Sequence, residues 1–224
     1  MMEIATFARE RALQKEGYDI IIGIDEAGRG PLAGPVIAAA CVVRETDFFV
    51  SGTTDAQWRL VRDSKLLSAK QRQEAFAFVR ENFFVGIGES GPETIDRINI
   101  LQATFLAMKK AINALERTIE KNNVYMNARE MMILVDGNQI IPNFTRKQQY
   151  VAHGDCIVKS IAAASIVAKV TRDEKMMAYD KLYPAYGFGA HKGYGTKAHM
   201  EALQKNGATP IHRKSFAPVK KVSL

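Results

Sequence analysis

Five short apolar runs of strand length are separated by stretches with helical periodicity, and this interleaving constrains the fold more than any other feature. The first two runs are joined by a turn rich in Gly and Pro, which is typical of a hairpin. Interleaved strands and helices define the α/β class. The strands are predicted at residues 19–25, 36–43, 82–89, 131–136 and 149–153.

The helical stretches are marked by apolar residues that recur three and four positions apart. Ser68 is predicted to cap the first of them, and Gly207 to end the last. No repeat and no linker divides the chain, so we expect one α/β unit with a small helical appendage. Further helices are predicted over Pro92 to Lys121, Ile157–Leu182 and Lys197–Asn206, and loops over Arg44–Gln57 and Tyr183–Thr196.

The composition excludes several classes of protein. Hydrophobic residues make up 47% of the 224, too many for an intrinsically disordered chain. No apolar run approaches the ~18 residues that span a bilayer, and residues 1–16 lack the apolar core of a signal peptide. Cys41 and Cys156 both lie in apolar stretches, so we expect two buried thiols and a cytoplasmic location. The net charge of +7 is weak evidence for a polyanionic partner.

Several common site motifs are absent. The chain has no P-loop, and its histidines lack the spacing of a zinc site. Ala33 stands where a dinucleotide fingerprint would need its third glycine. Ser165 and Lys169 are one residue too far apart for the nucleophile motif Ser-x-x-Lys.

Four acidic residues stand at strand ends or before the long helix: Asp25 and Glu26, Asp136, and Asp155. Such positions converge on one edge of an α/β sheet. Four carboxylates there would repel one another unless cations such as Mg²⁺ or Mn²⁺ neutralised them. Taken singly, a helix cap for Asp155 and a turn for Asp136 are the more common roles. Asp25 and Glu26 serve one site only if the chain turns there, because neighbouring strand residues point to opposite faces. Asp173 is excluded, since a continuous helix places it ~27 Å from Asp155.

Three features are candidates for binding a phosphate or a sugar. Gly28-Arg29-Gly30 follows the acid pair and allows close backbone approach, although a plain tight turn explains it equally. Lys65 precedes a helix and is either a phosphate contact or a surface lysine. Tyr194 has a glycine on each side, as suits a ring that stacks on a base or sugar, or else fills core. The basic residues expected around the acids are Arg29, Lys65, Lys192, Lys197, Arg213 and Lys214.

The segment Gly23-Ile-Asp-Glu-Ala-Gly-Arg-Gly-Pro-Leu-Ala-Gly-Pro-Val36 closely resembles ribonuclease HII, the type 2 bacterial ribonuclease H. Related type III enzymes lack this Gly-Arg-Gly followed by Pro-Leu-Ala-Gly. One departure is His153, which stands where a Lys is common; a pH-sensitive phosphate contact and a structural histidine both remain open. Further matching blocks follow in family order at 63–68, 95–100, 135–137, 154–155, 160–173, 191–196 and 212–216.

The resemblance implies a ribonuclease H-like fold, with a central mixed five-stranded sheet flanked by helices. We expect residues 18–182 to form the catalytic core and residues 183–224 a C-terminal loop–helix appendage that contacts substrate. The implied enzyme is a metal-dependent endonuclease that hydrolyses the RNA strand of RNA–DNA hybrids. It would also incise 5′ to single ribonucleotides embedded in duplex DNA, leaving 3′-OH and 5′-phosphate ends.

The resemblance also implies roles for individual residues. Asp25 would bridge two divalent cations, Mg²⁺ or Mn²⁺, and Tyr194 would pack beside the RNA–DNA junction. Lys65 would contact the nucleic-acid backbone. We expect a monomer without an obligate protein partner. Val219–Leu224 has no aromatic pair of the kind that docks on a sliding clamp, so that partner is not expected. The catalytic, metal-binding acids would be Asp25, Glu26, Asp136 and Asp155, and the loop that contacts the 2′-OH and its phosphates would be Gly28, Arg29 and Gly30.

Two alternatives remain at this point. One is a ribonuclease H that cuts only longer RNA tracts. Cleavage of a duplex with one ribonucleotide distinguishes it from an enzyme that incises at single ribonucleotides. The other is a catalytically silent module that binds hybrids. The four acids argue against such a module, because carboxylates facing a polyanion weaken its binding unless a metal is present.

Overall fold

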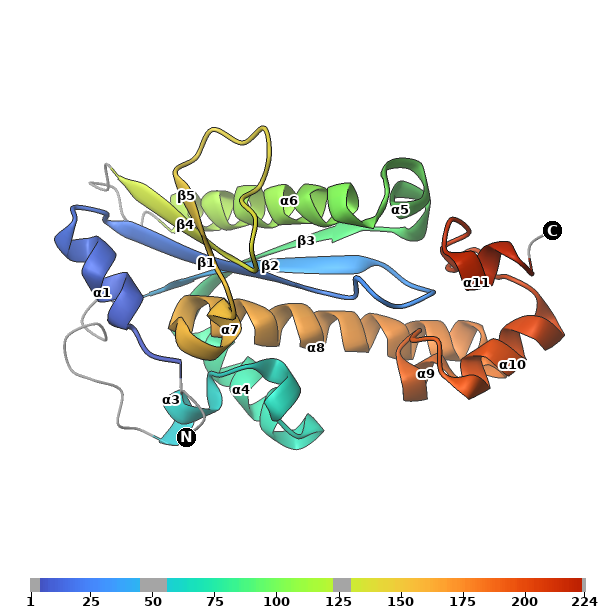
Figure 1. Ribbon diagram of the computed structural model, residues 1–224. Coiled ribbons are helices and arrows are strands. Elements are labelled where there is room, and N and C mark those ends of the chain that lie inside the picture. Colours follow the sequence, from blue (N-terminus) through green and yellow to red (C-terminus); the bar gives the residue numbers. More distant parts are fainter. Residues whose placement is uncertain (1–4, 45–55, 123–129, 223–224) are drawn as a thin grey trace.

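A single mixed sheet organises the chain, whose computed structural model describes residues 5–44, 56–122 and 130–222 (Figure 1). The strand order is β3-β2-β1-β4-β5. β1 pairs antiparallel with β2, which confirms the predicted hairpin, and parallel with β4, so the sheet is mixed as expected. The strands are β1 (Ile20–Ala27), β2 (Val36–Val43), β3 (Phe83–Ser90), β4 (Met131–Asp136) and β5 (Gln148–Val151).

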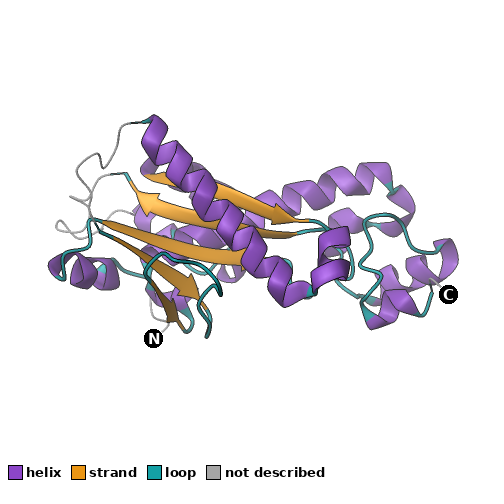
Figure 2. Ribbon diagram, turned by 90° about the horizontal axis from the view of Figure 1, so that it is seen from above, coloured by secondary structure: helices purple, strands orange, loops and turns teal. Residues whose placement is uncertain are grey.

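Helices cover both faces of the sheet. α6 crosses one face diagonally and α8 runs along the other (Figures 1 and 2). The longer helices are α1 (Ala8–Lys15), α4 (Ala69–Asn82), α5 (Pro92–Ile98), α6 (Ile100–Lys121), α8 (Lys159–Leu182) and α10 (Lys197–Asn206). The short ones are α3 (Ala56–Leu60), α7 (Gly154–Ile157), α9 (Phe188–His191), α11 (Ala217–Lys220), η1 (Ser64–Leu66) and η2 (Pro184–Tyr186). No helix in these described ranges is long and apolar enough to cross a membrane.

The alternation of side chains along β1 fixes which face each later residue takes. Ile20, Ile22 and Ile24 pack in the cluster under α6, whereas Ile21 packs in the cluster under α8. Gly23 also faces α8, where a Cβ would lie 2.2 Å from the main-chain carbon of Ser160. The absence of a side chain at Gly23 therefore lets the first turn of α8 rest directly on the sheet.

The start of α8 is held by a residue from the other end of the chain. Val158, its N-cap residue, provides no side-chain cap. Instead the buried carboxyl of Glu10 in α1 accepts a hydrogen bond from the Ser160 amide at 2.8 Å. Burial raises the pKa of Glu10. This contact ties α1 to the helix that passes beneath the strand ends.

Three predicted elements differ from the structure. The stretch from Pro92 to Lys121 is two helices, because Asn99 has a φ of 65° and caps α6 through its contact with the Gln102 amide. The helix predicted from Ile157 begins at Lys159, since Val158 is extended and separates α7 from α8. The predicted loop 183–196 contains η2 and α9. Residues 45–55 of the predicted loop 44–57 lie outside the described ranges, and Gln57 belongs to α3.

The C-terminal helices gather beyond the far end of α8 (Figure 1). Phe188 and Tyr186 pack with Met176 of α8 and with Ala33 from the turn after β1. A second small cluster joins Leu203 of α10 and Val219 of α11 to Leu32. The region is thus attached to the sheet through one helix and through the Gly/Pro turn.

Candidate active site

Two acidic residues lie side by side at the carboxyl ends of the parallel strands β1 and β4. Ile24 pairs with Val135, and Asp25 and Asp136 each follow by one residue. Leu134 packs under α8, so Asp136 takes that face as well, and Asp25 shares it by the alternation of β1. The register of two parallel strands therefore brings these carboxylates together.

Asp155 reaches the same place from α7. His153, with a φ of 54°, turns the chain after β5, and the Asp155 amide donates to Asp136 Oδ1 at 3.4 Å. Asp155 lies inside α7 and does not cap a helix, so the simple capping role is wrong. One carboxylate oxygen from each of Asp25, Asp136 and Asp155 lies within 4.8 Å of the others. That donor set suits a hard divalent cation.

Glu26 points the other way. It follows Asp25 within β1 and the strand does not turn before Gly28, so its side chain is on the α6 face. There it pairs with Arg29 at 3.3 Å. A small pocket beside it is lined by Arg29, Asp136 and residues of α6 that include Thr104. The structure thus groups three of the four predicted acids and places the fourth across the strand, next to the same edge.

The electrostatics of the cluster favour a bound cation. Burial and the charges of Glu26 and Asp136 raise the pKa of Asp25 well above its ordinary value. Burial, then the charge of Asp155, raises the pKa of Asp136, and burial raises that of Glu26. The ionised carboxylates are therefore disfavoured first by burial and then by their mutual repulsion, and a divalent cation offsets both effects.

Lys65 meets the cluster directly. Its Nζ lies 3.2 Å from Asp155 Oδ2 and 3.9 Å from Asp63 Oδ1. Asp63 orients this lysine, because the Asp63 carboxylate accepts a hydrogen bond from the Lys65 amide. Asp63 is thereby the N-cap residue of η1. The Lys65 side chain is 75% exposed, so it remains accessible to a phosphate while it touches the acids.

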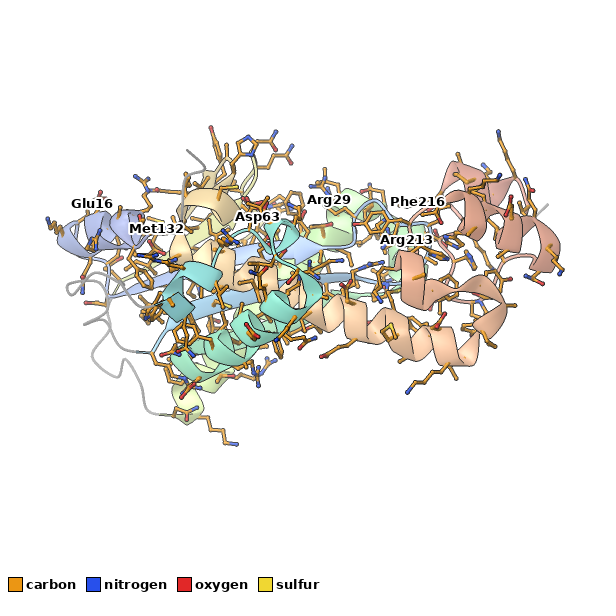
Figure 3. All side chains as sticks on the ribbon, turned by 90° about the horizontal axis from the view of Figure 1, so that it is seen from below. Glu16, Arg29, Asp63, Met132, Arg213 and Phe216 are labelled. Atoms are coloured by element: carbon orange, nitrogen blue, oxygen red, sulfur yellow. The ribbon has the colours of Figure 1, made fainter. Side chains whose placement is uncertain are left out.

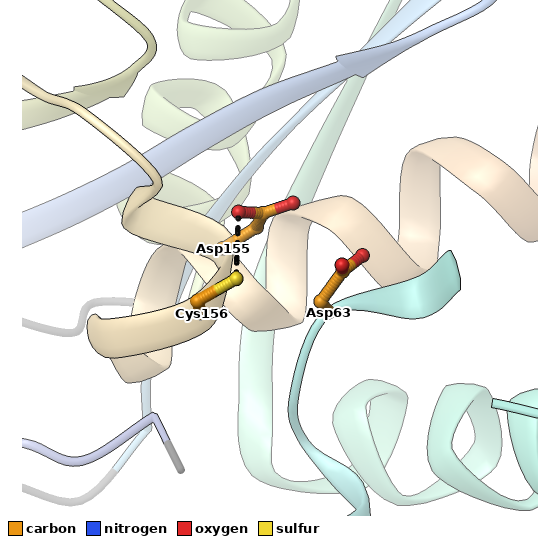
Figure 4. A group of neighbouring side chains, drawn as sticks. All are labelled: Asp63, Asp155 and Cys156. Atoms are coloured by element: carbon orange, nitrogen blue, oxygen red, sulfur yellow. Dashed lines mark hydrogen bonds between the residues drawn. The ribbon is translucent and has the colours of Figure 1, made fainter. Parts of the chain in front are cut away.

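A second group of possible ligands shares Asp155. Atoms of Asp63, Asp155 and Cys156 lie within 4.8 Å of one another (Figure 4). Burial raises the pKa of the Cys156 thiol to about 11, so it is protonated at neutral pH and donates to Asp155 Oδ1 at 3.5 Å. Cys41 is buried as expected, but Cys156 is partly exposed, since α7 lies at the edge of the site.

Sequence reasoning missed the support beneath Asp25. Ser165 on α8 hydrogen-bonds to that carboxylate, and its hydroxyl lies 3.0 Å from the hydroxyl of Ser64 in η1. Both serines are buried. The small residues noted on this helix gave a signal for close packing but none for this contact. Asp173, in contrast, pairs with Lys169 at 2.7 Å, as expected of a residue outside the cluster.

Two buried arginines hold the segment that follows β1: Arg213 binds the glycine loop, and Arg172 binds the residues after it. Arg213 donates to the carbonyls of Gly28 at 2.5 Å, Arg29 at 2.8 Å and Gly34 at 3.0 Å. Arg172 donates to the carbonyl of Pro35 at 3.1 Å and to those of Ala33 and Lys192. Arg213 was expected among the basic residues around the acids, but it is 0% exposed and its donors bind main-chain carbonyls, so its charge is not offered to a phosphate.

The loop also places Tyr194. Its ring is 46% exposed, and the Arg172 guanidinium lies 5.9 Å from the ring centroid. A Cβ at Gly30 would come within 3.8 Å of the Tyr194 ring. Tyr194 is therefore a surface ring beside the glycine loop and does not fill core. In Figure 3, Asp63, Arg29 and Arg213 follow one another along the molecule toward the C-terminal helices.

The other predicted basic residues differ in their exposure and in the partners of their side chains. Arg29 is exposed and pairs with Glu26. Lys192 donates to the carbonyl of Gly189 at 2.5 Å and to the sulfur of Met177. Lys197 is 91% exposed and lies 3.9 Å from Glu201. Lys214 contributes its amide, which donates to Asp96 at 2.9 Å.

Known proteins match the chain over most of its length. The family model described as Ribonuclease HII matches residues 22–219. Ribonuclease HII of Acholeplasma laidlawii is 46% identical over 224 residues, which cover 99% of this chain and 98% of the relative. Ribonuclease HII of Clostridioides difficile is 48% identical over 208 residues, which cover 91% of this chain and 73% of the relative.

Solved structures share the fold. Ribonuclease H2 from Pyrococcus horikoshii matches with a TM-score of 0.66 at 24% identity, over 91% of this chain and 97% of that one. Bst-RNase HIII in complex with Mn²⁺ matches with a TM-score of 0.66 at 18% identity, over 91% and 68%. RNase HII in a complex with PCNA from Archaeoglobus fulgidus matches with a TM-score of 0.61 at 23% identity, over 87% and 93%.

The ribonuclease H-like fold predicted from the motifs, with a mixed five-stranded sheet flanked by helices, is confirmed. The close relatives cover both the acids and the glycine loop, which lie within the matched residues. The chain belongs to the ribonuclease HII family and is a ribonuclease H, a metal-dependent endonuclease that acts on the RNA strand of RNA–DNA hybrids.

Proposed function

We propose that this enzyme also incises duplex DNA on the 5′ side of a single embedded ribonucleotide and leaves 3′-OH and 5′-phosphate ends. One observation carries the proposal: buried Arg213 fixes the Gly28–Gly30 loop, and buried Arg172 holds Lys192 close to the exposed ring of Tyr194. A single ribonucleotide offers one 2′-OH to recognise, so an enzyme that uses it needs such a rigid contact surface. A longer hybrid offers many positions and needs it less.

The acids would hold two divalent cations, Mg²⁺ or Mn²⁺. Asp25, Asp136 and Asp155 fit this role because one oxygen of each lies within 4.8 Å of the others, and burial together with neighbouring carboxylates raises the pKa of Asp25. Glu26 would complete the set from the α6 side of the strand. Two bound cations in such a site stabilise the attacking and leaving oxygens of phosphoryl transfer.

The chain's own groups would bind and orient the substrate. The exposed Arg29 side chain and the main chain of Gly28 and Gly30 would contact the 2′-OH and its neighbouring phosphates. Tyr194 would pack beside the RNA–DNA junction, since its ring is exposed and braced by Arg172. Lys65 would contact a backbone phosphate near Asp155.

We propose that the catalytic residues and the C-terminal substrate contacts belong to two parts of the chain. Residues 18–182 would form the catalytic core, and residues 183–224 a C-terminal appendage that contacts substrate through Tyr194. The appendage packs on α8 and on Leu32 and Ala33, which continue the glycine loop. Substrate contact and loop position would therefore be coupled through one set of packed residues.

We further propose that the protein acts as a monomer and needs no protein partner for cleavage. We also propose that it is located in the cytoplasm. Two free thiols are in keeping with a reducing compartment. RNase HII from Archaeoglobus fulgidus forms a complex with PCNA, but that finding applies to the archaeal protein and does not assign a partner to this chain. Cleavage by the purified chain alone tests the need for a partner, and sedimentation tests the monomer.

The decisive experiment is a cleavage assay on a duplex with one embedded ribonucleotide, run with Mg²⁺, with Mn²⁺ and with a chelator. We expect one incision 5′ to the ribonucleotide, with a product that a polymerase extends from its 3′-OH. A long RNA–DNA hybrid is the matched control substrate. Cleavage of the hybrid alone would contradict the proposal and favour an enzyme limited to longer RNA tracts.

A second measurement separates catalysis from binding. Binding of the uncleaved hybrid is titrated with and without Mg²⁺. We expect Mg²⁺ to strengthen it, since metal ions remove the repulsion between the acids and the phosphates. Strong binding without metal and no cleavage with it would favour a silent hybrid-binding module.

A further inference from the structure

A cluster of histidines lies in the appendage, away from the acids. His199 of α10 and His212 are 0% and 1% exposed. Aromatic rings surround them, with Phe188 edge-on to His199 and tilted against His212. A buried imidazole needs a partner for each nitrogen, so its hydrogen bonds reveal its protonation state.

The main chain fixes the state of His212. The amide of Thr209 can only donate, and it lies 2.9 Å from His212 Nδ1. That nitrogen therefore carries no proton. In a neutral ring the proton is then on Nε2, which lies 3.1 Å from Nε2 of His199. His212 thus donates to His199.

The state of His199 follows in turn. Its Nε2 accepts from His212, so the proton of its neutral ring is on Nδ1. That nitrogen lies 2.9 Å from the main-chain carbonyl oxygen of Tyr194 and donates to it. Hydrogen bonds run in one direction from Thr209 through two histidines to Tyr194, and the two rings hold opposite tautomers.

A third histidine braces the same segment. His191 stacks on His199 with ring centroids 4.5 Å apart. Its Nδ1 accepts from the Gly193 amide at 3.1 Å, so its Nε2 donates to the carbonyl of Tyr186 at 2.8 Å. The carbonyl of Gly193 accepts from the Leu32 amide at 2.8 Å, which joins this segment to the glycine loop.

An added proton disrupts this arrangement. On His212 Nδ1 it would displace the Thr209 amide and leave only the Thr209 hydroxyl oxygen, 2.8 Å away, to accept it. On His199 Nε2 it would face the proton of His212. The titratable groups that face the pair are His191 from α9 and the Tyr186 ring from η2. The guanidinium of the next residue, Arg213, points to Gly28. None of these groups is anionic at neutral pH, so none compensates a buried imidazolium.

We propose that His199 and His212 are positioning residues: a hydrogen-bond relay of fixed, opposite tautomers that holds the Tyr194 main chain and thereby aims its ring at the substrate. This inference rests on the proposed role of Tyr194 in recognising an embedded ribonucleotide. The relay acts through Tyr194 and touches neither substrate nor metal.

The tautomers are tested first, on the unmodified protein. Long-range ¹H–¹⁵N correlation spectra at pH 7.5 report which ring nitrogen carries the proton. We expect Nδ1–H for His199 and Nε2–H for His212, both neutral. The same tautomer in both rings, or a charged ring in either, would overturn the relay. His199→Phe and His212→Phe assign the signals.

Kinetics then test the function. His199→Phe keeps the packing but removes the donor to Tyr194, whereas His199→Asn retains a donor near the position of Nδ1. On the single-ribonucleotide duplex we expect His199→Phe to raise KM roughly three- to tenfold, as loss of one hydrogen bond does, with kcat little changed. The KM of His199→Asn should be close to that of the wild type. Gln204→Ala, an exposed neutral change on the same helix, is the matched control and should leave KM unchanged.

A double-mutant cycle distinguishes a failure of the relay from a failure of the proposed role of Tyr194. If the relay acts through Tyr194, His199→Phe has no further effect in a Tyr194→Ala background. A loss in Tyr194→Ala together with an unchanged His199→Phe would overturn the relay and leave the role of Tyr194 intact. No loss in Tyr194→Ala would remove the role of Tyr194 and, with it, the relay's function. Equal losses in His199→Phe and His199→Asn, with both folded, would also overturn the relay.

Discussion

Arg213 Nη2 donates to the carbonyl oxygen of Gly28 at 2.5 Å, although 185 positions separate the two residues. Gly28 has a φ of 98°, which favours glycine, and a Cβ there would lie 2.1 Å from Nε of Arg172. The loop that follows the acid pair is therefore shaped by the end of the chain. This contact joins the C-terminal region to the strand that holds Asp25, because the loop continues directly from that strand.

Replacing Arg213 should loosen the loop without touching the acids. Arg213→Lys keeps the charge, but its single nitrogen cannot occupy the three positions from which Nε, Nη1 and Nη2 reach the carbonyls. Each buried carbonyl left without a donor costs about 1–3 kcal/mol. We expect a lower free energy of unfolding and a higher KM on the single-ribonucleotide duplex. Urea unfolding and steady-state cleavage measure the two effects. Lys220→Met, an exposed change nearby, is the control. Wild-type values for Arg213→Lys would show that the three hydrogen bonds do not shape the loop.

Asp25→Asn should remove activity and yet stabilise the metal-free protein. The pKa of Asp25 is raised in the fold, so its ionised form opposes folding, and this cost grows as pH rises through that pKa. The amide removes the charge at similar volume. We expect a higher Tm in chelator at pH 8, where each kcal/mol is worth about 2–4 °C, and a smaller rise of Tm when Mg²⁺ is added. A lower Tm in chelator would contradict this account of the cluster.

Asp136→Asn tests the assignment of the metal-binding acids. Its carboxylate faces Asp25 and Asp155, and little of the core depends on it. We expect turnover to fall on the order of 10²–10³-fold or more, as when one group that stabilises transition-state charge is lost, with the fold retained. Asp173→Asn, which affects the ion pairs with Lys169 and Arg72 outside the acid cluster, is the control. Cleavage by Asp136→Asn at the wild-type rate in Mg²⁺ would show that the assignment is wrong.

The sequence predicted the elements that depend on local pattern and missed those that depend on distant contacts. The five strands and the capping residue Ser68 follow from periodicity and side-chain chemistry, and both are confirmed. The grouping of Asp25 with Asp136 follows from the shared end of two parallel strands. Arg213 was expected among the exposed basic residues around the acids, whereas it is buried and donates to the carbonyls of Gly28 and Gly34. Residue type gave no sign of that burial.

Tyr194→Ala should impair cleavage at a single ribonucleotide more than cleavage of a long hybrid. A base–aromatic stacking contact is worth about 1–3 kcal/mol, which corresponds to roughly a five- to 150-fold loss in kcat/KM. Tyr194→Phe keeps the ring and should retain most of the activity if packing matters more than the hydroxyl. Both variants are compared on the two substrates under identical metal conditions. Equal rates for Tyr194→Ala and wild type on the single-ribonucleotide duplex would remove this role.

The buried histidines make stability depend on pH in the acid range. Burial lowers the pKa of His212 from 6.5 to about 4, and burial also lowers that of His199. Between pH 6.5 and 4 the unfolded chain therefore binds more protons at these sites than the folded one. Stability from His212 is complete above pH 6.5 and is lost as pH falls toward 4. The raised pKa values of Asp25 and Asp136 act with the opposite sign, so the histidine effect is isolated by comparison with His212→Phe. We expect the free energy of unfolding in urea to fall less steeply below pH 6.5 for His212→Phe than for wild type. Parallel curves for the two proteins would mean that His212 gains no extra proton on unfolding in this range.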